Sequence, residues 1–117
     1  MIRPWHDIET LTLSGARERY DEVEKAFAEV RRNYSGFRGW FKRDMREEDT
    51  NTLTSCVGVL LPLSLNDAVK TEAERRTPYN STLHSKVINL NGEILFYASK
   101  FRNTGAHFLG MFADEID

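Results

Sequence analysis

The sequence predicts an α+β fold, with a single antiparallel sheet and two helices on one of its faces, and three observations favour it. Apolar residues recur every three or four positions between residues 16 and 34, which is typical of an amphipathic helix. The runs 37–43 and 53–61 alternate or are rich in β-branched residues, as strands are. Asn91-Gly92 separates two further apolar runs, which is the strongest short-range signal of a β-hairpin. At 117 residues, the whole chain is expected to form one domain.

In chain order, a short strand is expected over 8–13 and a helix from Ser14, whose hydroxyl can cap it, to Gly36, which accepts the left-handed conformation common at helix ends. One helix face carries Ala16, Tyr20, Val23, Phe27, Val30 and Tyr34. The polar run 46–51 is expected to be a loop.

Pro62 is expected to end the strand 53–61, because proline cannot donate to a ladder. Ser64 then opens a short helix that runs to about Arg76. The hairpin pairs Lys86–Leu90 with Glu93–Phe101, and residues 106–113 form either a third strand of the meander or a terminal helix.

Composition limits the classes of function. The chain is 40% hydrophobic and 29% charged and has no run near the roughly 20 apolar residues of a membrane span, so we expect a cytoplasmic protein with no membrane partner. A net charge of -2 makes nucleic acid an unexpected partner for the molecule as a whole. Cys56 is the single cysteine, which excludes an internal disulfide and a cysteine-rich metal site.

The order of elements from Ile8 to Arg76, with the segments EVEKAFAEV and SGFRGW, resembles the ferredoxin-like dimeric α/β-barrel families. These are the antibiotic-monooxygenase-like and stress-responsive barrel proteins, many of which have a similar turn after the first helix. The resemblance implies a homodimer with a hydrophobic cavity in each protomer. It also implies binding of a hydrophobic or aromatic small molecule, with a cofactor-independent oxygenase or cyclase as the activity.

The resemblance does not extend to the heme-degrading members. They use an Asn on the first strand, a Trp on the second helix and a His after it, whereas this chain has Glu9, Thr10 and Thr12 on the strand and only His84 near the third position. No cofactor is therefore expected.

Two other architectures stay open. A helix, two strands, a helix and three strands is also the order of roadblock-type interaction modules, and VINLNGEILFYASKFRNTGAHFLGMF is similar to the closing strands of PAS-like domains. A roadblock-like protein would be a non-catalytic module that binds a protein partner, and a PAS-like protein would hold a small ligand against its sheet.

Four polar-tipped residues are candidates to line a ligand cavity, since such a site needs apolar walls with a few orienting groups. They are Trp40, Tyr97, His107 and His84. No metal site is expected, because the histidines lack ligand spacing. Cys56 is expected to be a buried structural thiol, and no residue pattern identifies a catalytic group.

The stretch Arg31 to Arg46 mixes six cations with four aromatic residues, a composition that can bind single-stranded nucleic acid. Most of its aromatics are expected in the core. A face with Arg38, Trp40 and Lys42 would remain, and we expect it to favour an anionic partner.

Overall fold

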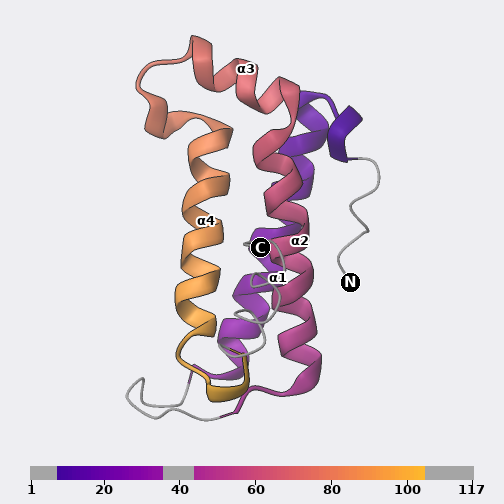
Figure 1. Ribbon diagram of the computed structural model, residues 1–117, viewed down its shortest axis with the longest axis vertical. Coiled ribbons are helices and arrows are strands. Elements are labelled where there is room, and N and C mark those ends of the chain that lie inside the picture. The colour runs from indigo at the N-terminus through magenta and orange to yellow at the C-terminus, as the bar shows by residue number, and fades with distance from the viewer. Residues whose placement is uncertain (1–7, 36–43, 105–117) are drawn as a thin grey trace, which may run out of the picture.

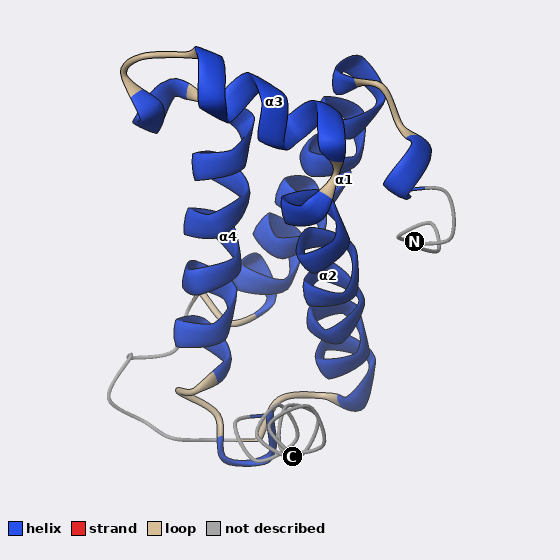
Figure 2. Cartoon of the chain, turned by 45° about the horizontal axis from the view of Figure 1, so that its top comes forward, coloured by secondary structure: helices blue, strands red, loops and turns tan. Residues whose placement is uncertain are grey.

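The computed structural model describes residues 8–35 and 44–104, and these residues form a helical bundle (Figure 1). The 3-10 turn Ile8–Thr10 precedes α1 (Leu13–Asn33), α2 (Glu47–Leu65), α3 (Asp67–Arg75), a second 3-10 turn (Tyr79–Ser81) and α4 (Leu83–Ala98). No strand occurs within the described ranges (Figure 2). The expected α+β sheet is therefore wrong, and so are the ferredoxin-like barrel and the roadblock-like and PAS-like alternatives.

The helices α1, α2 and α4 run side by side along the long axis of the bundle, and α3 crosses one end (Figures 1 and 2). The central helix is α2, which contacts α1 on one side and α4 on another. All four helices contribute to one core, whose fully enclosed members include Val23, Leu53, Leu60, Val69 and Ile94. The described residues thus share a single hydrophobic centre.

The helix predicted from Ser14 is confirmed as α1, with Val23, Phe27 and Val30 of the expected stripe buried. Its cap differs from the expectation, because the Thr12 hydroxyl accepts a hydrogen bond from the Gly15 amide at 3.2 Å. The residues 8–10 expected in a strand form a 3-10 turn instead.

The run 53–61 is not a strand but the middle of α2, and the expected loop 46–51 contains the start of that helix. Buried residues Leu53, Cys56, Val57, Leu60 and Leu63 recur at helical spacing. α1 and α4 pack on α2, and after its first turn the helix has no charged residue, so it lacks the charged face that normally marks a surface helix.

Pro62 lies in the last turn of α2 instead of ending a strand. A proline there removes the hydrogen bond to the carbonyl of residue 58, which is Gly58, and a Cβ on this glycine would meet no atom within 4 Å. The predicted short helix is confirmed as α3, but Asn66 and not Ser64 caps it.

The predicted hairpin is also wrong, because Asn91 and Gly92 lie within α4. No described glycine has the positive φ that the favoured two-residue hairpin turn requires. The buried residues Leu83, Val87, Leu90, Ile94 and Ala98 follow helical spacing, and their packing on α2 offsets the roughly 1 kcal/mol that a glycine costs inside a helix. The expected elements at 37–43 and 106–113 lie outside the described residues.

Candidate interaction surface

Tyr97, one of the four candidate cavity residues, packs against other aromatic rings. Its ring lies 5.6 Å from Phe27 and 5.4 Å from Phe101, both in edge-on contact, and Phe101 meets Tyr34 at 5.0 Å. Burial raises the pKa of the Tyr97 hydroxyl. The Tyr97 ring thus takes part in an aromatic cluster that joins α1 to α4 and to Phe101.

His84 lies at the other end of α4, where its Nδ1 hydrogen-bonds the Tyr79 hydroxyl. The structure therefore does not bring His84 and Tyr97 together, since Tyr97 follows His84 by thirteen positions, or about 20 Å along α4. Trp40 and His107, with Arg38 and Lys42 of the expected anionic-partner face, lie outside the described residues.

Cys56 is fully buried, and its position on α2 differs from the strand on which it was expected. Burial raises the pKa of its thiol to about 12, so almost no thiolate forms near neutral pH. Among the described residues, no three His, Cys, Asp or Glu side chains are grouped closely enough to hold a metal ion.

At the lower end of the bundle, a polar network joins α1 to the start of α2. The Tyr34 hydroxyl donates to Asp49 Oδ2 at 2.7 Å and accepts a hydrogen bond from the Arg46 amide at 2.9 Å. Asp49 is buried and also forms an ion pair with the Arg46 guanidinium at 3.2 Å. The network satisfies a buried carboxylate, and so its clearest role is structural.

We expect Tyr34→Phe to lower the free energy of unfolding by about 1–3 kcal/mol, because it leaves both the buried Asp49 oxygen and the Arg46 amide short of a partner. Chemical denaturation measures the change. Tyr79→Phe, at an exposed tyrosine, is the control and should change stability by less than about 0.5 kcal/mol. Equal effects of the two variants would contradict a structural role for this network.

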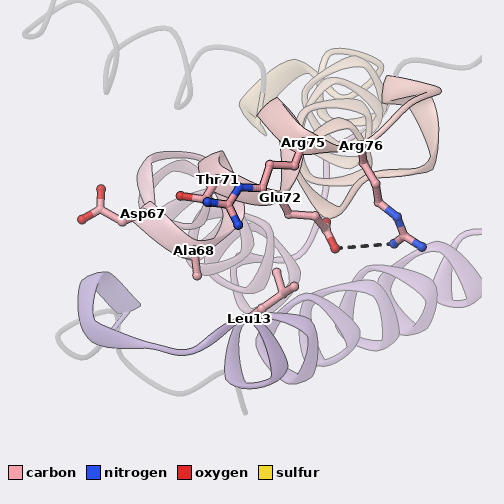
Figure 3. A pocket seen from close by; sticks show the side chains of 7 residues that line it. All are labelled: Leu13, Asp67, Ala68, Thr71, Glu72, Arg75 and Arg76. Carbon is pink, nitrogen blue, oxygen red and sulfur yellow. Dashed lines mark ion pairs between the residues drawn. The ribbon is translucent and has the colours of Figure 1, made fainter.

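At the upper end, Glu72 of α3 connects three elements. Its carboxylate accepts a hydrogen bond from the Leu83 amide at 2.8 Å and pairs with Arg17 of α1 at 2.7 Å and with Arg76 at 3.7 Å. It lines an open depression of about 580 Å³, whose other lining residues are Leu13, Asp67, Ala68, Thr71, Arg75 and Arg76 (Figure 3). Four of its lining residues are charged, namely Asp67, Glu72, Arg75 and Arg76, so this depression is not the apolar cavity predicted from the sequence.

The stabilising effect of Glu72 should depend on pH. The Leu83 amide hydrogen bond, followed by Arg17 and Arg76, lowers the pKa of Glu72 in spite of the opposing effect of burial. Because the pKa of Glu72 is lower in the folded than in the unfolded chain, its ionised carboxylate stabilises the folded state. This contribution is fully present above the unfolded-state pKa of about 4.3 and is lost as the pH falls through the folded-state pKa. We expect Glu72→Gln to be less stable than the wild type at pH 7 and the difference to shrink below about pH 4.

Urea denaturation at pH 7, 5 and 3.5 measures this difference, with the exposed Glu74→Gln as the control. A difference between wild type and Glu72→Gln that stays constant over that range would show that the charge of Glu72 does not contribute.

A third feature is the solvent-facing side of α2, which carries no charge. From Thr50 to Asn66 the sequence has no Asp, Glu, Lys, Arg or His. Leu65 is 68% exposed and Leu61 37% exposed, although both are large apolar residues. We define the α2 outer face as the exposed or half-buried side chains on this side: Asn51, Thr54, Ser55, Gly58, Leu61, Pro62 and Leu65.

The outward side of α4 has a shorter apolar stripe, with Ile88, Gly92 and Phe96 one turn apart. Phe96 is 69% exposed, and the Lys100 ammonium lies 5.3 Å from its ring centre. Unlike the α2 outer face, this stripe is interrupted by Glu93 and ends at Lys100, so it is shorter and more polar.

Sequence reasoning missed the α2 outer face because it placed Leu61 in a strand, whose alternating faces differ from those of a helix. The absence of charge from Thr50 to Asn66 was visible in the sequence. On a helix, Leu61 and Leu65 fall on a different side from Leu53, Val57, Leu60 and the other buried residues, and this spacing would have located the face.

Comparison with protein-family models, curated proteins and solved structures finds no match. Within the described part of the chain, no single helix is long and apolar enough to cross a membrane, whereas α2 and α3 taken together meet that test across a bend of 59°.

Proposed function

We propose that this protein is a non-catalytic interaction module that binds another protein chain through the α2 outer face. The observation that carries the proposal is the exposure of Leu61 and Leu65 on a helix without a charged residue from Thr50 to Asn66. A helical segment without charged residues is normally buried on most sides, whereas α2 presents Leu61, Pro62 and Leu65 to solvent near its C-terminal end. Contiguous exposed apolar surface of this kind is typical of interaction sites.

The packing around Tyr97 supports an interaction module over a ligand-binding protein. A cavity for an aromatic molecule would leave space beside this ring, whereas the rings of Phe27 and Phe101 lie 5.6 and 5.4 Å from it. Binding of a hydrophobic or aromatic small molecule, with oxygenase or cyclase activity, stays a prediction that depends on Trp40 and His107. Nucleic-acid binding through Arg38, Trp40 and Lys42 likewise stays a prediction.

The double variant Leu61→Glu/Leu65→Glu tests the proposal. Both positions are exposed, so the variant should fold, but two carboxylates would be buried without partners in any complex that covers this face. The control is Thr71→Glu/Asn89→Glu, which adds the same charge at exposed helical positions of α3 and α4.

The measurement is quantitative affinity capture from the native source, repeated with each captured protein in purified form. We expect at least one binding partner, another copy of the chain included, to be lost with the α2 variant and kept with the control. Binding that both variants retain equally would refute the α2 outer face as the interaction site.

A further inference from the structure

We infer that single-stranded nucleic acid binds along the lower half of the seam between α1 and α4, with its phosphates at cations of both helices and a base stacked on Phe96. We call this surface the cationic seam and define it by five exposed residues: Lys25, Arg31, Arg32, Phe96 and Lys100. The α2 outer face shares no residue with it, so the inference goes beyond the proposed function and does not depend on it.

Cations from two helices meet at this seam because α1 and α4 are in contact and both end at the lower end of the bundle (Figure 1). The Arg31 guanidinium of α1 lies 4.8 Å from the ring centre of Phe27. The Lys100 ammonium, just after α4, lies 5.8 Å from the ring centre of Tyr97, and the two ring centres are 5.6 Å apart. Arg31 and Lys100 therefore flank one pair of rings, so a strand of a few nucleotides can reach both.

The cations of the seam have little carboxylate nearby to neutralise them. Within the described part of the chain, no ion pair involves Lys25, Arg31 or Lys100, and Arg32 pairs with Glu29 at 3.7 Å through side chains that are each 73% exposed. An exposed pair of this kind contributes little to stability. The helix dipole accounts for Arg31 and Arg32 in the last turn of α1, but its effect does not extend to Lys25, two turns earlier. Folding thus leaves these charges available to an anionic partner.

The surface of α1 is hollowed where its cations lie. An open depression of about 530 Å³ has six described lining residues: Lys25, Ala28, Glu29, Arg31, Arg32 and Ser35. Glu29 is the only acid among these six. The small side chains of Ala28 and Ser35 lie among the long cationic ones, so an anionic strand in the depression can approach three cations at once.

Acidic residues mark the upper limit of the cationic seam. Burial and the charges of Glu24 and Glu93 raise the pKa of Tyr20 to about 12, and the Tyr20 hydroxyl donates to Glu24 at 3.3 Å. Both carboxylates therefore lie near Tyr20, which precedes Phe27 by two turns of α1. Positive charge is thus concentrated in the lower half of the seam, although the chain as a whole is acidic.

Phe96 supplies a flat ring next to these charges. It is 69% exposed, and the Lys100 ammonium lies 5.3 Å from its ring centre. Proteins that bind single strands combine such an aromatic platform, on which a base stacks, with cations that follow the phosphates. In a duplex the base faces are already stacked on one another, so the exposed ring favours a single strand.

Two other anionic partners fit the seam less well. An acidic protein would use the cations but would have no specific need of the ring. An anionic bilayer would need a wide apolar face, whereas Phe96 and Ile88 are two turns apart on α4 with Glu93 between them.

Fluorescence anisotropy with a labelled oligodeoxythymidine of about 12 nucleotides, at about 50 mM salt, tests the inference. Arg31→Gln/Lys100→Gln should weaken binding at least about tenfold. It should also reduce the slope of log affinity against log salt by about 1.4, since each phosphate contact on a single strand contributes about 0.7. The control Lys70→Gln/Lys86→Gln removes the same charge from exposed positions of α3 and α4 at the upper end, and should change affinity less than about threefold.

Stacking is tested separately at Phe96. Phe96→Ala and Phe96→Leu should each weaken binding at least about fivefold, because leucine keeps an apolar contact but has no flat ring. Ile88→Ala, at an exposed position on the same helix, is the control and should leave binding unchanged. All these positions are exposed, and circular dichroism checks that each variant retains the helical fold.

Absence of oligonucleotide binding at low salt, or equal losses from the two double variants, would overturn the inference. Wild-type affinity in Phe96→Leu would overturn the stacked base. Polyglutamate that binds as tightly as the oligonucleotide and independently of Phe96 would assign the seam to an acidic protein. Sedimentation with anionic phospholipid vesicles that Phe96→Ala abolishes, without oligonucleotide binding, would assign it to a bilayer, and either result would overturn nucleic acid as the partner.

Discussion

Phe27→Ala should lower the free energy of unfolding by about 3–5 kcal/mol, the range for removing a buried phenylalanine. Phe27 of α1 is 2% exposed, and its ring is in edge-on contact with that of Tyr97 in α4, with the ring centres 5.6 Å apart. The loss combines the transfer free energy of the ring with that of the cavity left behind. Thermal and urea denaturation measure it.

Phe96→Ala is the matched control, since it removes the same side chain from the solvent-facing side of α4, where Phe96 is 69% exposed. We expect a change in stability within about 0.5 kcal/mol. Similar losses for Phe27→Ala and Phe96→Ala would contradict the orientation of α4 in the bundle.

Asn66→Ala should have the second largest effect, about 3 kcal/mol. Asn66 is 1% exposed, and its Nδ2 donates to the carbonyls of Ile8 at 2.7 Å and Leu11 at 3.1 Å. Its Oδ1 accepts a hydrogen bond from the Val69 amide at 3.1 Å and thereby caps α3. Removing the side chain loses the cap, worth about 1 kcal/mol, and leaves two carbonyls at the buried site without this donor.

Thr12→Ala provides the comparison for Asn66→Ala, because Thr12 caps α1 from an exposed position through the single bond to Gly15. It should lower the free energy of unfolding by about 1 kcal/mol. If both variants lost the same amount in urea denaturation, the hydrogen bonds from Asn66 to residues 8 and 11 would contribute nothing beyond the cap.

The sequence was sufficient to predict α1 and not α2 or α4, for a physical reason. α1 lies at the side of the bundle, so its buried stripe and charged face alternate with helical periodicity. α2 lies between its neighbours and has little polar surface, so its β-branched and apolar residues resemble a strand. The short α3 could be predicted because its polar residues mark its exposed side, although its cap could not.

Two local signals were overridden by tertiary packing. Asn91-Gly92 is a strong turn signal in isolation, but Leu90 and Ile94 on either side are both buried against the bundle, which keeps this segment helical. Pro62 usually ends an element, yet it lies in the last turn of α2 next to the open site at Gly58. Of the candidate site residues, Tyr97 was predicted to line a ligand cavity, and its half-buried ring packs against Phe27 and Phe101.

The central claim is that another protein chain covers the α2 outer face, and methyl NMR on leucine- and isoleucine-labelled protein tests it most directly. As protein concentration rises, or as a captured partner is added, the account predicts that the Leu61 and Leu65 methyl signals shift and become protected from a soluble paramagnetic probe. The Ile88 methyl, on the outward side of α4, should stay accessible throughout. Leu61 and Leu65 methyls that remain as accessible as Ile88 under every condition would contradict the claim.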